Sequence, residues 1–105
     1  MLLHSVKDFI IPTLTVLESL GGQATLKEIE ERFHERYALA LDPAMVWDKI
    51  TPNHRKPLWA DYCGSRVAFR FLKPEGLIVV ETLPGKGSTW KLTDKGKEKL
   101  AADRQ

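Results

Sequence analysis

The strongest constraint on the fold is one strand–turn–strand pattern near the C-terminal end of an otherwise helical sequence. Leu77 to Thr82 is rich in β-branched residues, Pro84 to Gly87 is a turn signal, and Ser88 to Leu92 reads as a returning strand. The pattern predicts a β-hairpin with strands over about 77–82 and 88–92 and a Gly-rich, basic tip. The expected fold class is therefore mainly α with a small β-hairpin (α+β).

Helical segments precede and follow this hairpin. Apolar residues at spacings of three and four predict the first helix, and Gly21-Gly22 is a strong stop signal for it. Pro12 lies inside this first helix and should kink it or mark a restart. Capping boxes at Ser5/Asp8 and Thr25/Glu28 mark two helix starts. Together with Asp42-Pro43 and a cap at Thr93 or Asp94, these signals predict helices over about 5–20, 25–37, 43–48, 58–73 and 94–103.

The helix predicted over 58–73 separates into two faces at 100° per residue. One face is small or apolar and should pack on the other helices: Ala60, Gly64, Val67, Ala68 and Phe71. The opposite face carries aromatic and basic residues: Trp59, Tyr62, Arg66, Phe69, Arg70 and Lys73. Arg66, Arg70 and Lys73 follow i, i+4, i+7 spacing, which places them in one stripe.

Helices followed by a two-stranded hairpin are the order of the winged helix-turn-helix, and a single domain over 1–105 is expected. The helix before the hairpin is then the recognition helix for the DNA major groove, and the hairpin is the wing. Arg66 and Arg70 are the candidates for base-edge contacts. Candidates for phosphate contacts lie on the same helix, on the wing (83–88) and on the basic loop 49–56: Lys73, Lys86, Lys49, His54, Arg55 and Lys56.

The charge distribution supports a partner for the second half of the chain. The formal net charge is +2, but residues 1–48 carry a net −4 and residues 49–105 a net +6. A basic half within a nearly neutral total indicates a polyanionic partner, and double-stranded DNA fits the predicted order of elements.

The sequence also resembles a known family, the N-terminal winged-helix domain of Mrr-type restriction-system proteins. The resemblance covers most of the chain and rests on an ordered set of short stretches: Asp8-Phe9-Ile10-Ile11-Pro12 with Leu14, Leu17, Leu20 and Gly21-Gly22; Leu26, Glu28-Ile29 and Phe33; Arg66-Val67-Ala68, Leu72 and Gly76-Leu77-Ile78; and Leu92-Thr93-Asp94-Lys95-Gly96-Lys97. It implies DNA binding or target recognition, in transcription regulation or in the recognition of modified or foreign DNA. Pro74 departs from the family pattern and predicts a distorted end of the recognition helix.

A second hypothesis uses the same fold for protein–protein interaction. Trp59, Tyr62 and Phe69 would then form an aromatic docking face, although packing against the rest of the protein is the expected role of Trp59 and Tyr62. A homodimer or a larger protein partner is compatible with the sequence.

The remaining expectations are negative. The family's restriction enzymes join this module to a nuclease domain, but these 105 residues contain no carboxylate–carboxylate–lysine pattern, so we expect no catalytic residues and no enzyme activity. The three His residues have no ligand spacing and Cys63 has no cysteine partner, so we expect no metal and no small-molecule cofactor. With one cysteine, no signal peptide and no apolar run of membrane-spanning length, a cytoplasmic protein with no membrane partner is expected.

Overall fold

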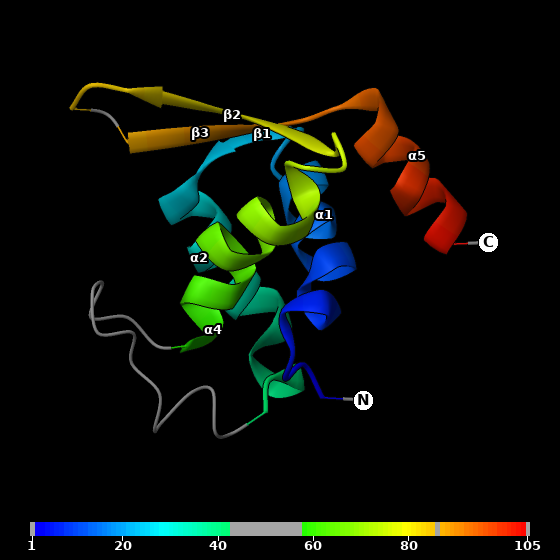
Figure 1. The fold of residues 1–105 in the computed structure, drawn as a ribbon. Helices are drawn as coiled ribbons and strands as arrows, with labels where there is room; N and C mark the ends of the chain where they lie inside the picture. Colours follow the sequence, from blue (N-terminus) through cyan, green and yellow to red (C-terminus); the bar gives the residue numbers. More distant parts are fainter. Residues whose placement is uncertain (1, 43–57, 86, 105) are drawn as a thin grey trace.

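The computed structural model describes residues 2–42, 58–85 and 87–104 (Figure 1). Helices pack beneath one face of a small antiparallel sheet, and the hairpin of that sheet projects beyond them. The predicted α+β class, mainly helical with a small sheet, is confirmed. The helix predicted over 43–48 and the basic loop 49–56 lie outside the described residues.

The first helical region changes its winding close to Pro12. A 3-10 turn, η1 (Val6–Phe9), leads directly into α1 (Ile10–Ser19). Pro12 therefore falls in the first turn of α1, where its missing N–H has no intrahelical acceptor to lose. The sequence-based expectation of a restart at this proline agrees with the change from 3-10 to α winding.

The sheet has three strands where the sequence predicted a two-stranded hairpin. β2 (Ile78–Leu83) and β3 (Gly87–Leu92) form the hairpin, and β1 (Gln23–Thr25) pairs with the other edge of β3 in the order β1-β3-β2. The register places Ala24 opposite Trp90, and the Leu92 N–H donates to the Gly22 carbonyl at 2.8 Å. The prediction missed β1 because three residues are too few to carry a strand periodicity.

The next helix, α2 (Leu26–Tyr37), begins directly after β1. Thr25 is its N-cap, and the Thr25 hydroxyl accepts from the Glu28 N–H while the Glu28 carboxylate accepts from the Thr25 N–H at 3.0 Å. Hydrogen bonds from the Thr25 backbone and hydroxyl lower the pKa of the Glu28 carboxyl. A 3-10 turn, η2 (Ala38–Ala40), follows α2.

The structure is helical over nearly all of the segment predicted at 58–73, but the winding is not the regular 100° per residue that was expected. The segment consists of α4 (Leu58–Asp61) followed by two π-helical turns, η3 (Tyr62–Arg66) and η4 (Ala68–Leu72), which together we call the third helical segment. Its N–H groups reach back five residues, from Val67 to Tyr62 and from Lys73 to Ala68. The second wide turn ends at Leu72, two residues before Pro74, whose lack of an N–H favours such a break.

Two features explain the irregular winding near Gly64. Gly64 has non-helical angles (φ −106°, ψ −112°), and a Cβ at this position would lie 2.9 Å from Leu26 Cδ1, so the absence of a side chain permits the close approach of α2. The Cys63 carbonyl accepts a hydrogen bond at 3.2 Å from the Thr13 hydroxyl, which is fully buried in α1. The buried threonine satisfies a carbonyl beside the distorted turn.

The core is organised around stacked aromatic rings. Phe33 stacks on Phe9 with ring centroids 5.4 Å apart, and on Trp59 at 6.3 Å, with both ring pairs nearly parallel. Tyr62 meets Phe9 edge to face at 5.7 Å. These contacts hold the third helical segment against η1 and α2. They also confirm the expectation that Trp59 and Tyr62 pack inward, and both side chains are partly buried.

The last helix, α5 (Asp94–Asp103), is joined tightly to the end of the hairpin. The Thr93 hydroxyl caps the helix by accepting from the Gly96 N–H at 3.1 Å, and it donates to the Gly76 carbonyl at 2.6 Å. Leu100 is fully buried, whereas Ala101 is exposed. The Arg104 guanidinium pairs with Glu18 of α1 at 2.7 Å.

Replacement of Thr93 tests this junction. Thr93→Ala removes the N-cap acceptor and the donor to the Gly76 carbonyl, so it should lower the free energy of unfolding by about 1–2 kcal/mol. Thr93→Ser keeps the hydroxyl and should lose only a fraction of that amount. Urea denaturation of both variants provides the measurement, and equal losses for alanine and serine would contradict the assigned hydrogen bonds.

Gly96 tests close packing at the same junction. A Cβ at Gly96 would collide with the Leu77 carbonyl oxygen, and it would lie 2.7 Å from Leu92 Cδ1. Helix propensity favours alanine over glycine by about 1 kcal/mol, but a backbone carbonyl cannot rotate away from the new methyl group. Gly96→Ala should therefore lower Tm by roughly 5–10 °C. Glu98→Ala, at an exposed position of α5, is the control and should leave Tm nearly unchanged.

Candidate nucleic-acid interface

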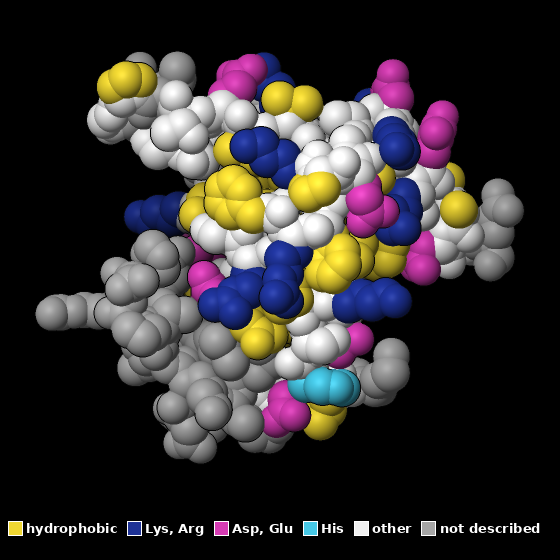
Figure 2. All heavy atoms as spheres, viewed as in Figure 1, with side chains coloured by type: hydrophobic (Ala, Val, Ile, Leu, Met, Phe, Trp, Pro, Cys, Tyr) yellow, Lys and Arg dark blue, Asp and Glu magenta, His cyan; other side chains and the backbone are white. Residues whose placement is uncertain are grey.

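The exposed side of the third helical segment carries the basic residues that the sequence singled out. Arg66, Arg70 and Lys73 are all exposed, while Val67, Ala68 and Leu72 between them are buried. Figure 2 shows Lys and Arg side chains gathered at the centre of the molecular face that this segment forms, with hydrophobic side chains between them. We call Arg66, Phe69, Arg70 and Lys73 the cationic face.

Arg66 is held in position by two neighbours. Its Nε donates to Asp61 Oδ2 at 3.0 Å, and its guanidinium carbon lies 5.4 Å from the centre of the Tyr62 ring. The Asp61 side chain is only 9% exposed, while the Arg66 side chain is 44% exposed. A buried carboxylate thus fixes the inner edge of a guanidinium group whose outer part reaches solvent. Such an arrangement reduces the side-chain freedom that Arg66 would lose on binding a ligand.

Lys73 and Phe69 form a second pair on the same face. The Lys73 ammonium lies 5.3 Å from the centre of the Phe69 ring, within the range of a cation–π contact. Phe69 is 60% exposed despite its apolar ring. The cationic face therefore combines positive charge with one aromatic ring that the protein interior does not cover.

Lys27 lies close to the third helical segment, although it belongs to the acidic part of the sequence, residues 1–48. It lies in the first turn of α2 and, with Thr25, Leu26, Gly87 and Ser88, lines a hollow of about 460 Å³ between α2 and the start of β3. Leu26 in turn approaches Gly64 of the third helical segment. The pairing of β1 with β3 places the start of α2 beside the hairpin. The sequence-based prediction missed this pairing and therefore the position of Lys27.

Other predicted site residues lie outside the described parts of the chain. These are Lys49, His54, Arg55 and Lys56 of the basic loop and Lys86 of the wing tip. The residues that flank Lys86, Gly85 and Gly87, both have φ of +74°, a conformation that glycine adopts without strain. Of the proposed aromatic docking trio Trp59, Tyr62 and Phe69, the fold leaves only Phe69 exposed.

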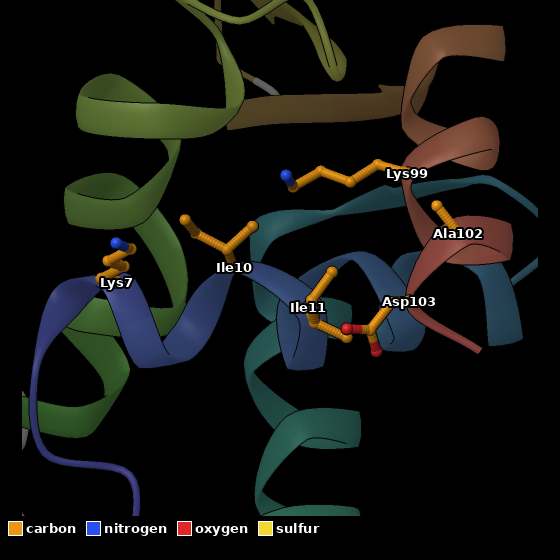
Figure 3. A pocket seen from close by; sticks show the side chains of 6 residues that line it. All are labelled: Lys7, Ile10, Ile11, Lys99, Ala102 and Asp103. Carbon is orange, nitrogen blue, oxygen red and sulfur yellow. The ribbon is translucent and has the colours of Figure 1, made fainter. Parts of the chain in front are cut away.

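A separate hollow of about 430 Å³ lies between the start of α1 and α5 (Figure 3). It is lined by Lys7, Ile10, Ile11, Lys99, Ala102 and Asp103. In Figure 3 the Lys7 and Lys99 side chains extend on either side of Ile10, and Asp103 lies beside Ile11. This lining offers aliphatic and charged contacts and carries no nucleophilic hydroxyl, thiol or imidazole.

Residues 2–42, 58–85 and 87–104 contain no group of three or more His, Cys, Asp or Glu side chains that could hold a metal ion. Cys63 is fully buried and its thiol donates to the Ala60 carbonyl at 3.5 Å, and so it belongs to the core. None of the helices in this described part of the chain is long and apolar enough to cross a membrane.

Comparisons with protein-family models, with curated proteins and with solved structures found no match to this chain. The candidate interface is therefore defined by its own geometry: a cationic face on the third helical segment, next to the start of α2 and the β2–β3 hairpin.

Proposed function

We propose that this chain is a non-catalytic winged-helix protein that binds double-stranded DNA. The order of its elements supports the winged-helix assignment: α1, β1, α2, the third helical segment, β2 and β3, with the three strands in one antiparallel sheet. In this arrangement the third helical segment is the recognition element and the β2–β3 hairpin is the wing.

One observation carries the proposal: Arg66, Arg70 and Lys73 are exposed together on the segment that precedes the wing. Duplex DNA is densely charged, and each Lys or Arg that contacts a phosphate releases condensed counterions, which favours binding. Arginine adds a planar donor group that matches the O6 and N7 acceptors of guanine in the major groove. A helical element fits into that groove.

The roles follow from position. Arg66 and Arg70 contact base edges, with Arg66 presented by Asp61, while Lys73 and Lys27 contact phosphates on either side. The proposal also retains the sequence-based candidates Lys49, His54, Arg55 and Lys56 of the loop and Lys86 of the wing as phosphate contacts. The wing tip, with glycines on both sides of Lys86, lies along the backbone of the duplex.

The biological setting is transcription regulation or the recognition of modified or foreign DNA in a restriction system, as the resemblance to Mrr-type N-terminal domains suggests. The protein acts in the cytoplasm, as a homodimer or with a larger protein partner, and needs no cofactor.

The alternative is a protein–protein interaction module on the same fold. It rested on an aromatic face of three residues, but the Trp59 ring stacks on Phe33 and the Tyr62 ring meets Phe9 edge to face. Phe69 remains as the one exposed member of that trio, with the Lys73 ammonium over its ring. This environment favours a polyanionic partner over an apolar protein surface.

The salt dependence of binding tests the proposal. Wild-type protein should bind a duplex of about 20 base pairs with an affinity that falls steeply as salt rises, and Arg70→Ala/Lys73→Ala should reduce the slope of log K against log[salt] by roughly one to two. Lys97→Ala removes an exposed cation from α5, away from the third helical segment, and should leave the slope unchanged. Fluorescence anisotropy at several salt concentrations gives the slopes. A wild type that shows no salt-dependent duplex binding would refute the proposal.

The Asp61–Arg66 pair gives a separate prediction about specificity. Asp61→Asn removes a negative charge and weakens the hold on Arg66, so it should strengthen binding to random duplex while reducing preference for a selected sequence by roughly fivefold. Glu75→Gln removes the same charge at an exposed position near the end of the segment. It should strengthen both kinds of binding equally. Competition titrations with selected and random duplexes measure the ratio, and identical ratios for the two variants would show that Asp61 acts through charge alone.

A further inference from the structure

Phe69 is the feature of the cationic face that charge does not explain. Its ring is 60% exposed, although the apolar residues on the inner side of the same segment, Val67, Ala68 and Leu72, are all buried. Exposing a phenyl ring to water carries a cost of roughly 1.5–3 kcal/mol relative to burying it. An isolated exposed ring is common on protein surfaces, but this one lies between cations on the face proposed to enter DNA.

The chemistry of the major groove restricts what Phe69 can contact there. The base edges in that groove present hydrogen-bond donors and acceptors, and the C5-methyl group of thymine is their apolar feature. Phosphates are charged and offer a phenyl ring no apolar surface. A ring carried into the groove by the third helical segment therefore has the thymine methyl group as its apolar partner.

We infer that Phe69 is a specificity-determining residue that selects thymine by contact with its C5-methyl group, next to a guanine read by Arg66 or Arg70. This inference rests on the proposed DNA binding and names the base that the site selects.

The position of Lys73 favours this contact over stacking on an unpaired base. Its ammonium lies over the Phe69 ring, 5.3 Å from the ring centre, and so occupies one face of the ring. The remaining surface of the ring suffices for a methyl group. Stacking on an extruded base would also require unpairing that base, at a cost of a few kcal/mol. Lys73 thus orients the ring and supplies charge for the neighbouring phosphate.

Removal of the methyl group alone provides the test. Wild-type full-length protein first enriches its preferred sequences from a pool of random duplexes, and the best duplex is then made with thymine or with deoxyuridine at each thymine position. Uracil keeps every hydrogen-bonding group of thymine and lacks only the methyl. We expect wild-type protein to bind the uracil duplex roughly three- to fivefold more weakly at one or more positions, since one buried carbon is worth about that factor.

Variants at Phe69 assign this difference to the ring. Phe69→Ala should bind the thymine and uracil duplexes equally, and Phe69→Leu, which keeps an apolar side chain, should retain part of the difference. Because Phe69 is mostly exposed, both variants should fold normally, which circular dichroism and Tm verify. Leu39→Ala, at an apolar residue of η2 that is 99% exposed, is the control and should behave as wild type.

The outcomes separate this inference from the function on which it rests. Absence of salt-dependent duplex binding would refute DNA binding itself, and with it the role of Phe69. Duplex binding that enriches no sequence, or that is equal for thymine and uracil, would overturn only the role of Phe69. A thymine preference that survives in Phe69→Ala would also overturn it. The role of Phe69 would also be overturned if wild-type protein bound single-stranded DNA more tightly than duplex and Phe69→Ala lost that preference. Such a result indicates that the ring stacks on bases.

Discussion

The aromatic stack centred on Phe33 is the interaction on which the rest of the structure depends. Phe33 of α2 lies against Phe9 of η1 and Trp59 of α4, so one residue connects three elements that are far apart in the sequence. Each such pair contributes about 0.5–1.5 kcal/mol beyond the area it buries. By fixing the inner side of the third helical segment, the stack also determines which of its residues face solvent.

The irregular winding of that segment has consequences for its surface. In a π-turn each residue rotates the chain by less than in an α-helix, so backbone hydrogen bonds connect residues that are five apart. The regular stripe expected from 100° steps is thus replaced by a broader surface, on which Asp61 reaches Arg66 across five positions and Lys73 lies over Phe69. A buried acid within a basic face orients a cation and, through its charge, also limits indiscriminate attraction of polyanions.

Structural features encoded by strong local sequence patterns were predicted correctly, whereas features with weak local patterns were missed. Capping chemistry at Thr25 and the pairing of two strands on either side of a Gly-rich tip are encoded within a few residues, and the structure has both. The small and apolar side chains of the third helical segment correctly predicted which of its faces packs inward. β1 was missed because its pairing depends on β3, nearly seventy residues away. The distortion at Gly64 depends on the approach of Leu26, and the position of Lys27 across a hollow from the start of β3 depends on β1. Such features arise from tertiary contacts that no local pattern records.

The attachment of the N-terminal residues has a practical consequence. Leu3 is buried and forms a parallel bridge with Leu41, with backbone hydrogen bonds to Ala40 at 2.7 Å and Asp42 at 3.0 Å. The N-terminus therefore lies beside η2, below α4 in Figure 1, while the C-terminus leaves from α5 on another flank of the molecule. A fluorophore or affinity tag attached after α5 keeps clear of this bridge, whereas one inserted just before Leu3 adjoins a buried side chain.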